Sequence, residues 1–249
     1  MARAVGTRGR FFAAYLVLGA LVGTGIGLFI VLLERPGPPP PPPWSTWRPA
    51  SSTTATQAQE IARHVGSAYR LSNGGPLARI AIGPLGQSRQ DFLPIGIPTK
   101  VQPKTLQDFQ FLARDESIVY TLCGTGRNCR INGGTGSLAE ATALRREALE
   151  LALYTLKYSR PIGYVFVLFP PGPRGSKPTS GLLFHRDQLS SQLRQPLHRT
   201  LPRSRPPVPG GISPGEERTV DRLTGNVYRF VGVENSPAIG EWLLIWPSG

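Results

Sequence analysis

The chain has 249 residues, of which 40% are hydrophobic and 17% are charged, and its formal net charge is +13. This length fits one folded domain or two small ones, and the composition excludes both a disordered polyampholyte and a protein made only of membrane spans. Two cysteines and three histidines exclude a disulfide-dense scaffold and make a four-ligand zinc site hard to assemble, so we expect no metal and no cofactor.

The basic charge has two interpretations. The 28 basic residues are mostly arginines, and the chain also holds 29 glycines and 26 prolines. A GC-rich genome encodes such a bias whatever the protein does. The alternative is a basic surface that concentrates polyanions, with an anionic lipid or a wall polymer as the partner rather than a nucleic acid.

An apolar segment near the N-terminus indicates a membrane anchor. Residues 11–33 include no charged side chain and would form a helix of about 34 Å, enough to cross a hydrocarbon core of about 30 Å. A cleaved signal peptide is the alternative, but its apolar region is usually shorter and ends at a small-residue cleavage site. Arginines precede the segment, so the positive-inside rule predicts a cytoplasmic tail over residues 1–10 and an extracytoplasmic remainder. We therefore expect a single-pass protein of the cell membrane, with the lipid bilayer as a partner.

Glycines recur within this predicted transmembrane helix. Gly19, Gly23 and Gly27 are spaced four residues apart. Small residues at this interval let two helix backbones approach closely, which predicts a homodimer or pairing with another membrane protein. The alternative is that these glycines only reflect the overall composition.

Residues 34–52 are rich in proline and predict a spacer. The six consecutive prolines at 38–43 favour polyproline II, which rises about 3.1 Å per residue, so the spacer would hold the folded domain about 40 Å from the membrane. Trp44 and Trp47 follow these prolines, and we expect them to dock on the folded domain, which we place at residues 53–249.

The folded domain alternates between helical and strand patterns. Apolar residues at three- and four-residue steps predict helices, and alternating or continuous apolar runs predict strands. Ser137, followed by Glu140, forms a capping box that predicts the start of the longest helix, whose apolar positions need partners on two sides. In chain order we expect a helix over 58–69, strands over 77–82 and 92–98, a helix over 105–113, a strand over 117–122, a helix over 138–158, strands over 162–169 and 182–185, a short helix over 187–193, and strands over 226–233 and 241–246. These elements predict an α+β or α/β domain of roughly four to six strands and three helices, with a flexible, basic, proline-rich loop around 170–214.

Cys123 and Cys129 enclose five residues and lie in the part of the chain that we expect outside the cytoplasm, where disulfides persist. We predict a structural disulfide between them. The alternative, a redox pair, lacks the C-x-x-C spacing that lowers a thiol pKa.

A loop rich in glycine and arginine leads from the second cysteine into the longest helix. Backbone N–H groups, a helix N-terminus and guanidinium groups would converge there, which is an arrangement that binds anions. The alternative is a tight turn that needs glycine only for its backbone conformation. The candidate anion-binding or ligand-binding residues are Arg127, Arg130, Gly133, Gly134, Thr135 and Ser137.

No catalytic signature stands out. His64, His185 and His198 fall in no metal-binding frame, there is no G-x-S-x-G, and the spacing of Arg146 and Glu150 is that of an ion pair on a helix surface.

We therefore expect a non-enzymatic, membrane-anchored docking or accessory component, in an arrangement that resembles many bacterial envelope proteins. The alternatives are an extracytoplasmic enzyme acting on wall or lipid-linked substrates through a cleft near Arg127, Arg130 and Ser137, or a ligand-sensing ectodomain. A deep pocket with several groups of shifted pKa would favour the enzyme, and a flat apolar patch would favour docking.

Overall fold

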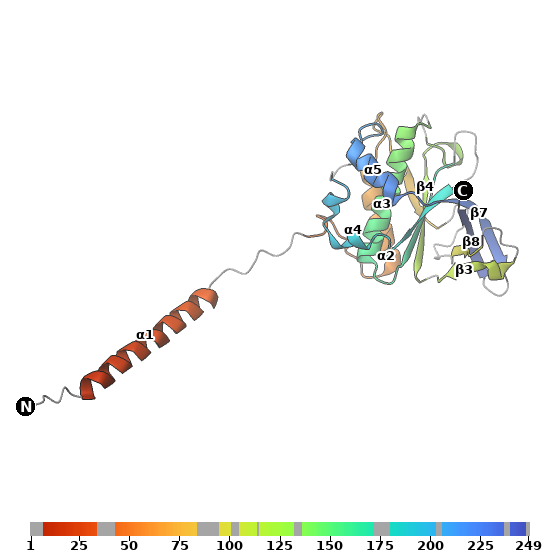
Figure 1. Ribbon diagram of the computed structural model, residues 1–249. Helices are drawn as coiled ribbons and strands as arrows, with labels where there is room; N and C mark the ends of the chain where they lie inside the picture. Colours follow the sequence, from red (N-terminus) through yellow and green to blue (C-terminus); the bar gives the residue numbers. More distant parts are fainter. Residues whose placement is uncertain are drawn as a thin grey trace, which may run out of the picture. The chain divides into compact units, whose positions relative to one another are not determined.

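The computed structural model describes residues 7–33, 43–83, 95–100, 105–113, 115–131, 136–171, 180–202, 206–236 and 240–247. The chain divides into two units, residues 1–42 and residues 43–249 (Figure 1). Each unit is described by itself. Most of the prolines of the predicted spacer lie outside the described residues.

The N-terminal unit contains one helix, α1 (Thr7–Leu33). A membrane-crossing helix needs about 20 consecutive apolar residues, and no helix in the described parts of the chain is long and apolar enough to cross a membrane. The transmembrane helix predicted over residues 11–33 is therefore wrong. A Cβ added to Gly19, Gly23 or Gly27 would meet no atom within 4 Å, so each of these positions of α1 has room for a larger side chain.

The second unit is built on one eight-stranded sheet in the order β1-β4-β5-β6-β7-β8-β2-β3. Most neighbours are antiparallel, and the pairs β4/β5 and β2/β8 are parallel. The strands are β1 (Arg79–Ile82), β2 (Ile95–Pro98), β3 (Phe109–Leu112), β4 (Ser117–Cys123), β5 (Tyr164–Leu168), β6 (Ser180–His185), β7 (Val227–Ser236) and β8 (Gly240–Pro247).

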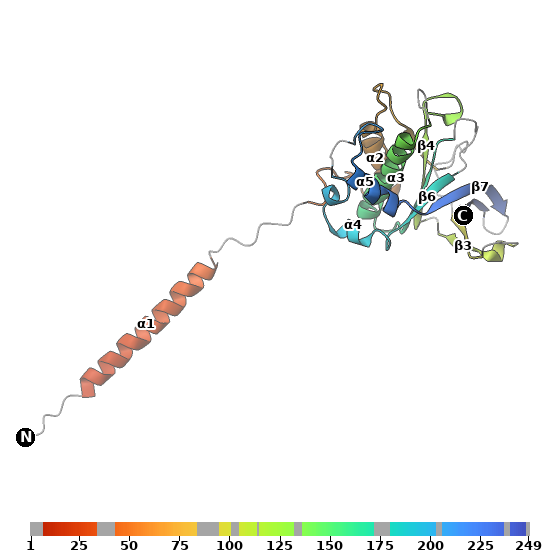
Figure 2. The same ribbon diagram turned by 45° about the horizontal axis from the view of Figure 1, so that its top comes forward.

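Helices cover one face of this sheet (Figures 1 and 2). They are α2 (Thr54–Ala68), α3 (Leu138–Tyr158), α4 (Ser190–Arg194) and α5 (Pro214–Leu223), with short 3₁₀ helices at Leu106–Asp108, Arg127–Cys129 and Leu197–Arg199. The main core fills the space between these helices and strands β4 to β6. A second cluster joins Ile95, Leu112 and Ile245 to Val119 and Phe166, so β2, β3 and β8 pack back onto the opposite face of the central strands.

Helix α3, the longest in the second unit, begins where the capping pattern predicts. Ser137 Oγ accepts a hydrogen bond from the Glu140 backbone N–H at 3.3 Å, and the Glu140 carboxylate accepts one from Gly136 N–H at 2.8 Å. Helix α2 packs on one side of α3, and α5 and α4 contact it elsewhere. The two-sided packing predicted for this helix is therefore confirmed.

The fold differs from the sequence-based expectation in its strands and helices. The domain is α+β, and its described residues form eight strands and four α-helices, more than the four to six strands and three helices expected. The helix predicted over 105–113 is wrong: a 3₁₀ turn at Leu106–Asp108 leads into β3, which pairs with β2. Asp108 stabilises this turn, because its carboxylate accepts a hydrogen bond from Thr105 N–H.

This part of the domain contains one helix that was not predicted and two elements that were. Helix α5, which was not predicted, begins after Ser213, whose side chain caps it by accepting from Glu216 N–H. Within the described parts of the segment around 170–214, β6 confirms the strand predicted over 182–185, and α4 confirms the short helix predicted over 187–193.

The two tryptophans before α2 pack on the domain, as expected. The Trp44 ring meets the rings of Tyr154 and Tyr158 edge-on, with centroids 5.4 and 5.7 Å apart. Trp47 stacks face to face on His64 at 3.9 Å. The backbone also takes part, since Leu197 N–H donates to Trp44 C=O at 2.7 Å. The folded unit therefore begins at Pro43 rather than at residue 53.

Candidate functional site

The edge of the sheet at β1 is the first candidate site. Among the described residues, β1 pairs with β4 alone. Gly83 N–H donates to Val119 C=O at 2.8 Å, and Ile82 lies opposite Tyr120, so Gly83 and Val119 form a hydrogen-bonded pair of the antiparallel ladder. Because this pattern alternates, Ile80 and Ile82 direct their backbone N–H and C=O groups away from β4, toward the open edge.

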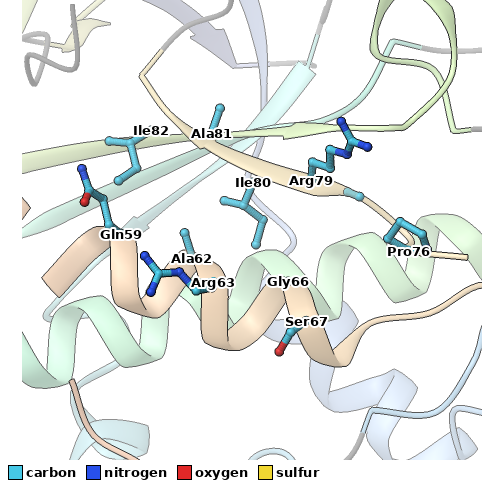
Figure 3. A pocket seen from close by; sticks show the side chains of 11 residues that line it. Gln59, Ala62, Arg63, Gly66, Ser67, Pro76, Arg79, Ile80, Ala81 and Ile82 are labelled. Atoms are coloured by element: carbon cyan, nitrogen blue, oxygen red, sulfur yellow. The ribbon is translucent and has the colours of Figure 1, made fainter. Parts of the chain in front are cut away.

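A groove of about 860 Å³ follows this edge, between β1 and α2 (Figure 3). Its lining includes two arginines, one from the helix and one from the strand, and no carboxylate. The lining residues are Gln59, Ala62, Arg63, Gly66, Ser67, Pro76, Ala78, Arg79, Ile80, Ala81 and Ile82.

Glycine at position 66 sets the distance between helix and strand. A Cβ on Gly66 would lie 3.0 Å from Ile80 Cδ1, closer than ordinary contact allows. The absence of a side chain at this turn of α2 lets Ile80 reach the helix backbone. Since side chains alternate along a strand, Ile80 and Ile82 face α2 while Arg79 and Ala81 face the other side of the sheet.

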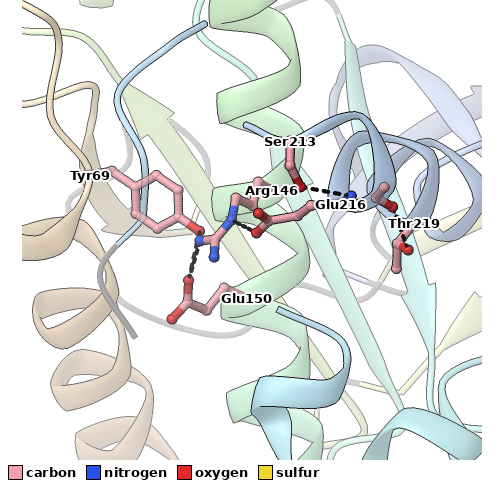
Figure 4. A network of polar contacts seen from close by, with 7 residues as sticks. Tyr69, Arg146, Glu150, Ser213, Glu216 and Thr219 are labelled. Carbon is pink, nitrogen blue, oxygen red and sulfur yellow. Dashed lines mark hydrogen bonds and ion pairs between the residues drawn. The ribbon is translucent and has the colours of Figure 1, made fainter. Parts of the chain in front are cut away.

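A second group of polar side chains is buried in the helical layer (Figure 4). Arg146, on α3, is fully buried. Its Nε donates to Glu216 Oε1 at 2.6 Å, and its Nη1 donates to Tyr69 Oη at 2.5 Å and to Glu150 Oε2 at 3.1 Å. Tyr69 in turn donates its hydroxyl proton to Glu150 Oε2 at 2.6 Å. The spacing of Arg146 and Glu150 indicated a surface ion pair, and the structure shows a buried one.

Glu147 lies beside this network and is fully buried. Neither of its carboxyl oxygens finds a hydrogen-bond partner among the described residues. Burial, and then the nearby Glu150, raises the pKa of Glu147 well above its usual range. Burial therefore favours the protonated, uncharged form of this carboxyl group.

A smaller cavity, of about 240 Å³, opens near the same part of α3. The rings of Trp44, His64 and Tyr154 line it, together with the carboxylate of Glu150. Burial raises the pKa of Glu150, against the lowering effect of Arg146 and Tyr69, and burial raises the pKa of Tyr154 to about 12. The pKa of His64 is lowered, also by burial.

The three side chains with shifted pKa values all make packing contacts or hydrogen bonds. His64 is stacked on Trp47, Tyr154 lies among aromatic rings, and Glu150 is bonded to its neighbours. The shifts follow from burial and an ion-pair network, which perturb pKa values without catalysis. The cavity thus brings aromatic rings and a largely buried carboxyl group together.

The predicted disulfide is confirmed: Cys123 and Cys129 are bonded to each other. The loop that they close needs a glycine at position 124, because a Cβ there would lie 2.0 Å from the carbonyl oxygen of Arg130. Asn128 and Cys129 both adopt positive φ, at 54° and 61°. The bridge thus holds a turn that few sequences would form unaided.

The other residues of the predicted anion site are only partly brought together. Arg127 and Arg130 lie at the disulfide loop, with Arg127 exposed. Ser137 is engaged in capping α3. Gly133, Gly134 and Thr135 lie outside the described residues. The described ones, Arg127, Arg130 and Ser137, line neither the groove nor the cavity.

Sequence reasoning missed the groove and the cavity. Arg63 and Arg79 are ordinary members of an arginine-rich chain, and nothing in their spacing shows that a helix and an edge strand bring them together. Glu150 carried a signal in its four-residue spacing from Arg146, but burial of that pair depends on α2 and α5. No family model, no curated protein and no solved structure matches the chain, so its function is argued from this geometry.

Proposed function

We propose that the chain is a docking protein that binds an extended, acidic segment of a partner protein by adding it as a strand along β1. The observation that carries this proposal is the open edge of β1, which presents the N–H and C=O groups of Ile80 and Ile82 beside a groove. Strand addition uses such main-chain groups for affinity and the flanking pockets for specificity.

The charge of the groove supports an acidic occupant. An added strand would turn alternate side chains toward α2, where Arg63 lies, and toward the other face, where Arg79 lies. Acidic side chains on either face would therefore meet a guanidinium. A second copy of the chain fits less well, because its own β1 would bring another groove lined by arginines, with no carboxylate among its described lining residues, to the same edge.

The disulfide supports a location outside the cytoplasm, because such bonds persist mainly in oxidising compartments. We propose an extracytoplasmic accessory role on this basis. A membrane-impermeant maleimide applied to intact cells would label Cys123 and Cys129 only after reduction with an impermeant reductant. Labelling that instead appears only after lysis, and without reductant, would place the domain in the cytoplasm.

The docking proposal is tested with a capped hexapeptide of alternating valine and glutamate, titrated into the full-length chain and followed by NMR. We expect the amides of Ile80 and Ile82 to shift and to gain protection from hydrogen exchange, and binding to weaken as salt rises. The same peptide with lysine for glutamate should bind at least about tenfold more weakly. Equal binding of both peptides, or shifts confined to another surface, would overturn the proposal.

Two variants of Ile82 distinguish the contribution of its backbone N–H to binding from that of its side chain. Ile82→Pro removes an N–H that points outward and keeps the ladder with β4, whereas Ile82→Ala keeps that N–H. We expect the proline variant alone to lose binding. A double charge reversal, Arg63→Glu with Arg79→Glu, should transfer binding from the glutamate peptide to the lysine peptide.

A further inference from the structure

The 240 Å³ cavity beside α3 is lined by rings, apolar side chains and a carboxylate. Trp44, His64, Tyr154 and His198 contribute rings, Leu197 and Leu201 contribute apolar surface, and Glu150 contributes the one carboxylate among the described lining residues. No lysine or arginine is among these described residues, and Lys157 Nζ lies 5.6 Å from the centroid of the Trp44 ring. Because the pKa of His64 is lowered by burial, its imidazole adds no positive charge at neutral pH.

Glu150 has one oxygen left for a ligand. Its Oε2 accepts from both Tyr69 and Arg146, whereas Oε1 accepts no hydrogen bond from any described residue. Unlike the oxygens of Glu147, Oε1 is not sealed from solvent, and Glu150 is exposed to only 8%. A carboxylate that is nine-tenths buried therefore has an open oxygen at the cavity that it lines.

The ion pairs around Glu150 leave its carboxyl group open to a further cation. Arg146 contacts the carboxylates of both Glu150 and Glu216, so its guanidinium is shared between them. Burial raises the pKa of Glu150, which means that burial disfavours the charged form. A cation bound at the open oxygen would favour that form again.

We infer that this cavity binds a small organic ammonium ion, with the cationic group against Glu150 and its alkyl substituents against Trp44 and Tyr154. Aromatic faces attract such cations through their quadrupole, more strongly when the cation is desolvated. The volume equals that of about eight water molecules at liquid density, which admits an ion of the size of choline. This site is separate from the groove at β1 and does not depend on docking.

Choline is the probe, and its uncharged carbon isostere dimethylbutanol is the matched control. With the full-length chain we expect choline to bind at least about tenfold more tightly than the isostere. Isotope-filtered NMR should show contacts from the choline methyl protons to the rings of Trp44 and Tyr154. Equal affinities, or methyl contacts only to other residues, would overturn the inference.

Glu150→Gln keeps the shape of the side chain and should remove the preference for choline over its isostere. Glu217→Gln, an exposed change on α5, should leave that preference intact. Because Glu150 also bonds to Arg146, folding of the variant is checked by circular dichroism. Trp44→Leu serves as the second test: it keeps the carboxylate and should weaken choline binding while affecting the isostere less.

Discussion

At the scale of single residues, the most unusual feature is that Glu147 is buried without a hydrogen bond to any described residue. Burying an unpaired polar group costs free energy, about 1 to 3 kcal/mol in mutational data. Helix α3 tolerates this cost because the helix also carries much of the apolar core, including Leu149, Leu151 and Leu153. Glu147 is therefore a local weakness in an otherwise well-packed helix.

We predict that Glu147→Leu raises the free energy of unfolding by about 1 to 3 kcal/mol at pH 7. The native pKa of Glu147 is raised, so above about pH 4.3 the native state keeps a proton that the unfolded state releases. The raised pKa therefore makes its whole contribution to the free energy of unfolding below that pH. This contribution is lost as the pH rises through the native pKa. Urea unfolding at a series of pH values should show that the free energy of unfolding falls less steeply with rising pH in the variant than in the natural chain.

The control for that experiment is Glu217→Leu, because Glu217 is exposed on α5. It should change neither the stability nor its pH dependence by much. If Glu147→Leu proves less stable than the natural chain, the carboxyl group makes a stabilising contact that the described residues do not include.

Single residues also show the limit of sequence reasoning. The spacing of Arg146 and Glu150 is visible in the sequence, but the same spacing occurs on exposed helix faces. Burial comes from Tyr69 after α2 and Glu216 on α5, which are 77 and 70 residues away along the chain from Arg146. A local sequence pattern therefore cannot predict that this ion pair is buried.

At the scale of elements, strong local patterns predicted helices and strands well. The amphipathic repeat of α2, the capping box of α3 and the apolar run of β5 all lie where the sequence placed them. The residues of β3 were misassigned to a helix because Phe109 and Leu112 fit helical spacing as well as strand pairing. The hairpin with β2 decides the outcome, through tertiary pairing that outweighs local preference.

Strand β6 depends on a glycine at one position. A Cβ on Gly181 would lie 2.5 Å from the carbonyl oxygen of Val167 and 2.9 Å from the ring of Phe166. The first atom belongs to the backbone of β5, so it cannot turn aside as a flexible side chain could. Strands β5 and β6 can therefore approach this closely only because residue 181 has no side chain.

We predict that Gly181→Ala lowers the free energy of unfolding by about 1 to 3 kcal/mol, since the strands must separate to admit the methyl group. Thermal and urea unfolding measure the loss. Gly163→Ala is the matched control, because a Cβ there would come no closer than 3.9 Å to Glu116 O and φ is not positive. That change should be neutral or slightly stabilising, and an equal loss in both variants would contradict the argument.

At the scale of the whole molecule, the start of the folded unit differs from the sequence-based boundary. Composition placed the spacer over residues 34–52, because prolines and polar residues continue to that point. Trp44 and Trp47 nevertheless pack against His64, Tyr154 and Tyr158. Their segment also closes one side of the cavity that Glu150 lines. The end of the predicted spacer is therefore part of both the core and a candidate site.

We predict that a chain shortened to residues 43–249 unfolds with nearly the free energy of the full-length chain, because the two units are compact separately. A chain of residues 53–249 loses both indole rings and the hydrogen bonds to Trp44 and Trp47 carbonyls. Removing a single packed Trp side chain costs about 3 to 5 kcal/mol, so the shorter chain should lose at least about 3 kcal/mol. Urea unfolding followed by circular dichroism measures this loss without relying on Trp fluorescence.

Trp44→Ala with Trp47→Ala in the 43–249 chain should reproduce most of the loss. Equal stability of all these chains would show that the tryptophans contribute nothing to the fold.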